Sequence, residues 1–329
     1  MKTIAFFSNR GRGGKTTLAY HLAWMYADRG IKVAIADLDP QANLTSLLLD
    51  EDRLEELWPD SEHSDTILGA IAPILRGTGA INPRHVEDIS DNIGLVVGDI
   101  GLSLFEEKLA TAWSGCVNEP ESALRSIAAF YGILKYASDA READLTLVDV
   151  GPNLSAINRA ALLAADHLVV PLSPDLFNLQ GLRTMGPALR DWRTGWAKRL
   201  SSAPSIAMEL PAGRISAAGY VLLRPTIRMD RPVQAYGRWM SHIPGAYLRA
   251  VLDGEDAGPQ RVADDPECLA QVKRYPSLMP MALEARKPMF FLKPADGAIG
   301  AHAGAVTQCY HDFRALAESI ARRVGIELS

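Results

Sequence analysis

The fold prediction for this sequence rests mainly on one stretch, Asn9-Arg10-Gly11-Arg12-Gly13-Gly14-Lys15-Thr16-Thr17-Leu18. It follows a short apolar run, residues 3–7, that is typical of a buried strand, and it precedes apolar residues at helical spacing that end at Gly30. Glycines let several backbone N–H groups converge on one anion, and the N-terminus of a helix adds positive potential. Strand, glycine-rich turn and helix together predict a phosphate-binding loop.

The loop ends in the sequence Gly-Lys-Thr, which predicts the roles of two individual side chains. A lysine in this place reaches the β- and γ-phosphates of a nucleotide, and the hydroxyl of the next residue holds Mg²⁺. A glycine-rich surface turn is the competing interpretation, and the flanking strand and helix argue against it. We therefore expect the following residues to bind the nucleotide: Gly11, Arg12, Gly13, Gly14, Lys15, Thr16 and Thr17.

Two carboxylates follow a second predicted strand, residues 32–37, in the sequence Asp37-Leu38-Asp39-Pro40-Gln41. Residues two apart on a strand point to the same side, so Asp37 and Asp39 share a face. At the carboxyl end of a parallel strand they lie beside the phosphate loop. Asp-Pro alone indicates only a turn, but its position next to a phosphate-binding loop favours a metal and phosphate site.

A third apolar strand, residues 144–149, ends in Asp149. One aspartate at the end of an apolar strand is typical of a Walker B motif, in which the carboxylate contacts Mg²⁺ through water. No Asn-Lys-x-Asp motif follows, which disfavours a guanine nucleotide.

These motifs resemble those of the ParA/MinD/Soj superfamily of deviant Walker A P-loop ATPases. The loop is similar to K-G-G-x-G-K-[ST], with Arg10 in place of the signature lysine and Arg12 in place of a glycine. Residues 37–43 resemble D-x-D-P-Q-x-N, and residues 158–166 resemble the N-A-L and A-A-D segments. Gly151-Pro152 stands where relatives have two prolines.

The resemblance implies a slow, Mg²⁺-dependent ATPase that forms an ATP-dependent homodimer. It gives catalytic roles to Asp39, which positions the attacking water, to Lys15, and to Arg10, which reaches the nucleotide of the partner subunit. Arg12 is the alternative for this trans contact, and arginine is not equivalent to lysine as a phosphate ligand. The resemblance assigns metal binding to Thr16, Asp37 and Asp149. It also implies that a partner protein, either a centromere-binding protein or a cargo adaptor, stimulates hydrolysis.

The whole chain, residues 1–329, is predicted to be one ParA-like α/β domain with a doubly wound, mostly parallel sheet flanked by helices. Predicted strands cover residues 3–8, 32–37, 93–97, 144–149, 167–172 and 215–223. Residues 50–66 hold eight acidic residues and one basic residue, which predicts an inserted solvated loop. Residues 225–276 resemble the family least and are interpreted as a second insertion.

Positive charge is concentrated in residues 183–250, which hold eleven basic and three acidic residues in a chain of net charge −5. Lysine and arginine supply most of the sequence-independent affinity for DNA. ParA-like relatives bind DNA nonspecifically through such residues, so we expect nonspecific DNA binding by Arg224, Arg228, Arg231 and Arg238. The alternative is that these arginines pair with the acidic residues of the chain or cover exposed helix faces.

The function predicted from this resemblance is DNA partitioning or cargo positioning. The alternative is a regulatory ATPase subunit that gates a protein partner, such as a defence effector or a transcription factor. A cytoplasmic protein is expected, associated with the nucleoid if it binds DNA. No apolar run reaches the roughly 18 residues of a membrane-spanning helix, and the three separated cysteines suit a reducing compartment.

Overall fold

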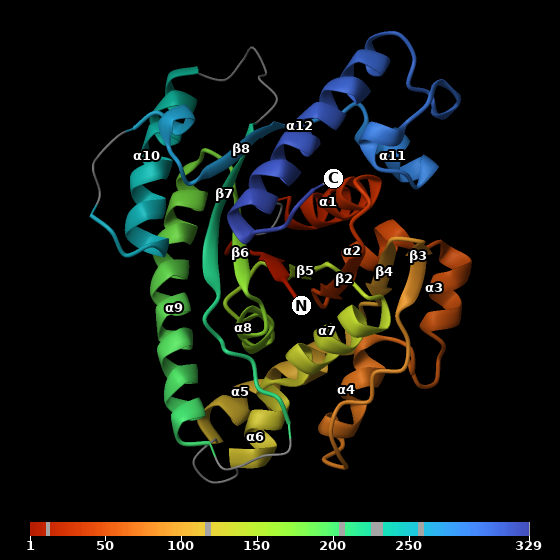
Figure 1. The fold of residues 1–329 in the computed structure, drawn as a ribbon, viewed down its shortest axis with the longest axis vertical. Coiled ribbons are helices and arrows are strands. Elements are labelled where there is room, and N and C mark those ends of the chain that lie inside the picture. Colours follow the sequence, from red (N-terminus) through yellow and green to blue (C-terminus); the bar gives the residue numbers. More distant parts are fainter. Residues whose placement is uncertain (11–13, 116–119, 204–207, 225–232, 256–259, 329) are drawn as a thin grey trace.

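The computed structural model describes residues 1–10, 14–115, 120–203, 208–224, 233–255 and 260–328; of residues 233–236 it describes the backbone only. Eight strands form one sheet in the order β3-β4-β2-β5-β1-β6-β7-β8, and only the β3–β4 pair is antiparallel (Figure 1). The strands are β1 (Thr3–Phe6), β2 (Val33–Leu38), β3 (Glu87–Ser90), β4 (Ile93–Val96), β5 (Leu145–Val150), β6 (His167–Leu172), β7 (Ser216–Arg224) and β8 (Cys268–Lys273).

Helices cover both faces of this sheet. They are α1 (Lys15–Asp28), α2 (Asn43–Leu48), α3 (Glu51–Leu57), α4 (Ile67–Leu75), α5 (Phe105–Gly115), α6 (Pro120–Ile127), α7 (Ala129–Ala140), α8 (Ala156–Leu163), α9 (Leu176–Ser201), α10 (Val233–Val251), α11 (Met279–Ala285) and α12 (Ala301–Val324). Parallel strands joined through helices require both faces to be covered, so the central strands are apolar on both sides.

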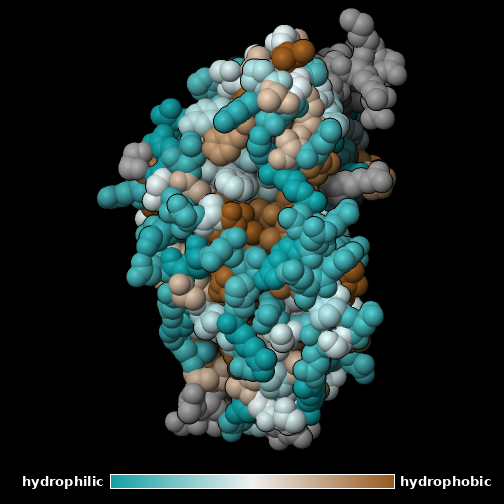
Figure 2. Space-filling view, turned by 90° about the vertical axis from the view of Figure 1, so that its right-hand side faces the viewer, coloured by the Kyte–Doolittle hydropathy of each residue, from teal (hydrophilic) through white to brown (hydrophobic). Residues whose placement is uncertain are grey.

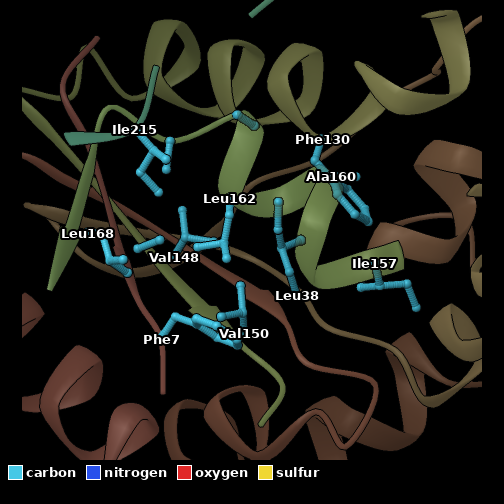
Figure 3. Close-up of a cluster of buried hydrophobic side chains, with 14 of the residues drawn as sticks. Phe7, Leu38, Phe130, Val148, Val150, Ile157, Ala160, Leu162, Leu168 and Ile215 are labelled. Carbon is cyan, nitrogen blue, oxygen red and sulfur yellow. The ribbon is translucent and has the colours of Figure 1, made fainter. Parts of the chain in front are cut away.

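Alternate residues of the central strands belong to two separate apolar cores. Ile4 and Phe6 of β1 pack in the core that α1 and α12 cover, whereas Ala5 and the following Phe7 pack in the core that α7 and α8 cover. Figure 3 shows the second core, where Val148 and Val150 of β5 meet Leu162 of α8. Neighbouring side chains of one strand therefore hold opposite helical layers, as the two-residue period of a strand requires.

The predicted doubly wound α/β fold is confirmed, and all six predicted strands are present within one or two residues. The sequence interpretation missed β3 and β8, the two edge strands. β8 lies within residues 225–276 and pairs with β7, so this part of the segment extends the main sheet. That residues 225–276 are an insertion stays a prediction.

The expectation of a loop over residues 50–66 is wrong for residues 51–57, which form α3. The Asp50 carboxylate accepts a hydrogen bond from the backbone N–H of Arg53 at 2.8 Å and so caps the helix. The Arg53 guanidinium also forms ion pairs with Glu56 and with Glu87 of β3. The one basic residue of the acidic segment thus ties α3 to the sheet, which charge counting does not reveal.

The surface around α3, α4 and α11 is mostly hydrophilic, with a hydrophobic area near its middle (Figure 2). Near α11, a small pocket is lined by Thr17, Tyr20, Leu47, Met279 and Leu283. Among the described residues, no helix is both long enough and apolar enough to cross a membrane.

Candidate nucleotide-binding site

Three adjacent strands bring the predicted motifs to one edge of the sheet. β5 lies between β1 and β2, and its Asp149 is in register with Phe6 of β1 and with Asp37 of β2. The chain leaves β1 toward the glycine-rich loop, and Asp39 lies just beyond the end of β2. The carboxyl edge of the sheet therefore holds the loop lysine and three carboxylates, as the sequence predicts.

The turn from the glycine-rich loop into α1 requires a glycine at position 14. Gly14 adopts a left-handed conformation with φ of 73°, and a Cβ atom there would lie 2.7 Å from Leu223 Cδ1. A side chain would meet both backbone strain and a clash with β7. Gly11, Arg12 and Gly13 of the predicted nucleotide-binding set lie outside the described residues.

Lys15 is the first residue of α1, and its side chain points into the site instead of into solvent. Lys15 is only 6% exposed, and its Nζ donates a hydrogen bond to the Arg10 carbonyl at 3.2 Å. Burial lowers the pKa of Lys15, while Asp149 and Asp39 act in the opposite direction. The ammonium group is thus held close to the loop backbone and to both carboxylates, where it can contact phosphate.

Asp149 is fully buried, and neither carboxylate oxygen has a hydrogen-bond partner among the described residues. Burial and then the charge of Asp37 raise the pKa of Asp149 well above its usual value, against the effect of the nearby Thr16 hydroxyl and of Lys15. Unsatisfied buried oxygens are costly, so this carboxylate is suited to receive a cation or its bound water. The residues here fit the predicted Mg²⁺.

Asp37 is also fully buried, but its oxygens are already engaged. Its Oδ2 accepts hydrogen bonds from the Thr45 backbone N–H at 2.8 Å and from the Thr45 hydroxyl at 2.9 Å, and Oδ1 accepts one from the Asp39 N–H at 3.3 Å. Burial raises the pKa of Asp37 to about 6, although these hydrogen bonds oppose the rise. Thr45 was not among the predicted site residues, because no local pattern shows that α2 folds back onto β2.

Asp39 is buried like Lys15, at 7% exposed, but slightly less completely than Asp37 and Asp149. Its Oδ1 accepts the Gln41 N–H at 3.1 Å, and a Cβ atom on Gly151 would lie 3.4 Å from the same oxygen. Gly151 is fixed by buried Asn158, whose Oδ1 accepts the Gly151 N–H at 3.1 Å and whose Nδ2 donates to the Gly151 carbonyl at 2.9 Å. Asn158 thereby holds the chain after β5 against Asp39, a positioning role that the sequence interpretation did not assign.

In this structure the Arg10 side chain contacts residues of its own chain. Its guanidinium forms an ion pair with Asp175, the residue that caps α9, and lies 4.9 Å from the ring centroid of Phe177. Both partners of the ion pair are more than one-third exposed. The Arg10 side chain is therefore accessible but engaged within its own chain.

A family model described as an AAA domain matches residues 1–201, more than half of the chain and all of the site described above. The chain belongs to this family, within the ParA/MinD group of P-loop ATPases. This confirms the family resemblance inferred from the motifs.

Individual relatives of this ParA-like chain agree with the assignment. It is 34% identical over 188 residues to the virulence plasmid ParA family protein pGP5-D of Chlamydia psittaci, a match covering 56% of the chain and 61% of the relative. The first curated relatives are matched over 48% to 64% of their own length.

Two solved structures resemble the ParA-like chain over nearly its whole length. Protein DIP2308 of Corynebacterium diphtheriae has a TM-score of 0.68 at 22% identity, covering 98% of this chain and 99% of the other. An ATP complex of McdA from Cyanothece has a TM-score of 0.63 at 18% identity, with 100% and 98% covered. At these identities the likeness establishes the fold.

The predicted DNA-binding arginines of the ParA-like chain are only partly described. Arg224 is exposed at the carboxyl end of β7, and Arg238 is exposed on α10. Arg228 and Arg231 lie outside the described residues. Other basic residues of the same stretch have structural contacts: the Arg199 guanidinium lies 3.9 Å from the Trp113 ring centroid and also bonds the Trp113 carbonyl.

We expect Asp149 to lower the stability of the nucleotide-free protein, although the proposed metal site requires it. Replacing Asp149 by asparagine removes a buried carboxylate whose charged form is disfavoured by burial and by the neighbouring Asp37. We therefore expect the nucleotide-free protein to gain about 1 kcal/mol in its free energy of unfolding. Urea denaturation without nucleotide and Mg²⁺ measures this change. Asp91→Asn, at an exposed position, is the matched control and should leave stability nearly unchanged. Destabilisation by Asp149→Asn would show that the charge is compensated in the folded protein.

Proposed function

We propose that this chain is a Mg²⁺-dependent ATPase whose ATP-bound form is a homodimer, and that it acts in the partitioning of DNA or the positioning of another cargo. The observation that supports this most directly is Lys15, buried beside Asp149 and Asp39 at the carboxyl edge of a parallel sheet. Phosphoryl transfer to water requires a lysine at the phosphates, a carboxylate for the metal ion and a second carboxylate for the water. Asp149 fits the metal role, because its oxygens accept no hydrogen bond among the residues that the structure describes.

Each group has a separate role in this proposal. Lys15 and the backbone of the loop hold the phosphates, and charge stabilisation there lowers the barrier to transfer. Asp149 and Thr16 would hold a Mg²⁺ ion, and Asp37, fixed by Thr45, would support them from the neighbouring strand. Asp39 orients the attacking water, since one of its oxygens has no partner among the described residues. When bound, Mg²⁺ supplies positive charge for the phosphate oxygens.

Arg10 is the residue proposed to reach the nucleotide of the partner subunit. The ion pair with Asp175 and the contact with Phe177 hold its guanidinium at the loop in the single chain. A phosphate of the partner subunit would therefore compete with Asp175 for the same guanidinium. Dimerisation then includes the small cost of breaking one exposed ion pair in each subunit.

This competition gives a quantitative expectation for Asp175→Asn. Asparagine keeps an oxygen that can accept the Asn178 N–H and so preserves the cap of α9, but it removes the charge that holds Arg10. An exposed ion pair is worth at most about 1 kcal/mol, and the dimer breaks one such pair in each subunit. The ATP-bound dimer should therefore become tighter by up to about thirtyfold. Sedimentation equilibrium with a nonhydrolysable ATP analogue measures the constant. Weaker dimerisation would mean that Asp175 itself supports the interface.

The partition role and the DNA contact rest on family membership and on charge. Relatives include a virulence plasmid ParA family protein, and Arg224 and Arg238 are exposed in a basic stretch of the chain. Phosphate contacts release counterions, so binding of this kind falls steeply with salt. Nonspecific duplex DNA, bound only in the ATP state, is the proposed partner, together with a protein that stimulates hydrolysis.

Binding to duplex DNA with ATP, with ADP and without nucleotide, at two salt concentrations, tests this role. The Asp39→Ala variant is used to prevent turnover. Binding that requires ATP and weakens with salt is the expected result, and Arg224→Ala with Arg238→Ala should reduce it. Formation of the ATP dimer without any DNA binding would overturn the partition role and favour a regulatory ATPase whose output is a protein partner.

A further inference from the structure

A cavity of about 390 Å³ lies between α9 and α10, on a part of the molecule that the nucleotide site does not use. Both helices pack on the end of the sheet formed by β6, β7 and β8 (Figure 1). Its lining consists of Leu176, Leu179, Arg183, Pro187, Arg190, Arg238, Trp239, His242, Ala246, Arg249 and Ala250.

The facing sides of the two helices explain why the cavity exists. The helices touch at Gly186, where a Cβ atom would lie 1.7 Å from the Ala250 carbonyl oxygen. Arg183, Pro187 and Arg190 recur at helical spacing and so share one side of α9. Long cationic side chains and a proline cannot interdigitate as apolar side chains do, which leaves space where two packed helices would ordinarily close it.

The lining is strongly cationic. Four arginines and a histidine line the cavity, and no acidic residue does so within the described part of the chain. Arg190 has an ion pair at 3.4 Å with Asp253, beyond the end of α10, and donates to the Ala250 carbonyl at 2.9 Å. Positive charge gathered on two facing helices attracts an anion into the space between them.

The apolar part of the lining limits what this anion can be. Leu179 and Ala250 are buried, Trp239 is half-buried, and the Arg238 guanidinium lies 5.4 Å from the Trp239 ring centroid. Guanidinium groups bind phosphate through paired N–H donors, whereas leucine and tryptophan favour an apolar or planar group. The volume lies within the range of ordinary small-molecule sites, about 300–1,000 Å³.

We propose that this cavity, named here the α9–α10 pocket, binds a small phosphorylated ligand with a planar ring, of the nucleoside phosphate class, independently of the Lys15 site. Arg183 and Arg190 contact the phosphate groups, and Trp239 contacts the ring. Duplex DNA is the weaker candidate for the same arginines, because its phosphates lie on a convex backbone and leave an apolar hollow unfilled.

The test uses the full chain carrying Lys15→Ala, so that the phosphate loop does not contribute to binding. GDP and inorganic pyrophosphate are titrated into this protein by isothermal calorimetry. We expect saturable one-to-one binding of both probes, with GDP tighter because its ring is also accommodated. Adding Arg183→Ala and Arg190→Ala should weaken both probes by at least about tenfold. Adding Trp239→Ala instead should weaken GDP and leave pyrophosphate nearly unchanged.

The controls separate the pocket from general charge effects and from misfolding. Arg322→Ala removes an exposed arginine of α12 and should change neither titration. Arg183→Lys with Arg190→Lys keeps the charge in an unaltered fold and should restore pyrophosphate binding in part. Absence of saturable binding in the Lys15→Ala protein would overturn the proposal. GDP binding that Arg183→Ala and Arg190→Ala leave unchanged would also overturn it. So would arginine variants that lose ATP-dependent DNA binding but still bind both probes.

Discussion

Lys15→Ala is expected to weaken ATP binding by about 100-fold or more and to abolish both hydrolysis and the ATP-bound dimer. The lysine is buried against the loop and against two carboxylates, so no other described cation can replace it at the phosphates. A hydrogen bond to a charged group is worth about 1.5–3 kcal/mol, and this variant removes the ammonium that would donate to the phosphates. Titration with a fluorescent ATP analogue measures the affinity.

Lys32→Ala is the matched control. The Lys32 side chain is partly exposed and pairs with Glu142, and neither residue belongs to the phosphate loop. It should bind ATP as the unaltered protein does. If the Lys15→Ala variant bound ATP within about threefold of the affinity of the unaltered protein, the nucleotide would have to bind elsewhere. This result would contradict the assignment of the loop.

Asp39→Ala is expected to separate binding from turnover. Asp39 is not part of either apolar core and is not assigned to hold the phosphates, so ATP should still bind and the dimer should still form. Loss of a group that orients or deprotonates the attacking water costs about 100-fold to 10,000-fold in rate. Single-turnover hydrolysis and size-exclusion chromatography after ATP addition measure the two effects, and the dimer should persist.

Asp65→Ala, an exposed carboxylate in the same acidic half of the chain, provides the control for loss of charge. It should hydrolyse ATP at the normal rate. If Asp39→Ala turned over ATP normally, the water-positioning role would have to pass to another group, and Asp149 would be the next to test.

The motif residues of the site could be predicted because each motif is local. Asp37 and Asp149 lie at the carboxyl ends of two predicted strands, and Lys15 begins the helix after the loop that follows a third. Parallel strands align their carboxyl ends at one edge of the sheet. Strand register then places Asp37 beside Asp149 without further information. The central six strands were predictable for the same reason, because each is a continuous apolar run.

The contacts that fix these motif residues could not be predicted in the same way. Thr45 satisfies Asp37 from α2, and Asn158 holds Gly151 from α8, both through long-range or side-chain hydrogen bonds that leave no periodic signal. The ion pair of Arg10 with Asp175 joins residues 165 positions apart. Edge strands β3 and β8 were missed because one side of each is poorly buried, so their sequences lack a continuous apolar run.

Charge composition was the least reliable guide. The acidic stretch after residue 50 includes a capped helix because of two specific interactions, those of Asp50 and Arg53. The basic stretch divides among a cation–π contact at Trp113, a cationic pocket between α9 and α10, and exposed arginines. The local net charge therefore indicated which segments differ from the rest of the chain, but it did not indicate what each charged side chain does.

The most direct test of the proposed switch is the molar mass of the unaltered protein in solution, by sedimentation velocity, with Mg²⁺ and a nonhydrolysable ATP analogue or ADP. The account predicts a dimer with the analogue, a monomer with ADP, and a monomer with the analogue for Arg10→Ala. A monomer under all conditions, or a dimer that does not depend on the nucleotide, would contradict it.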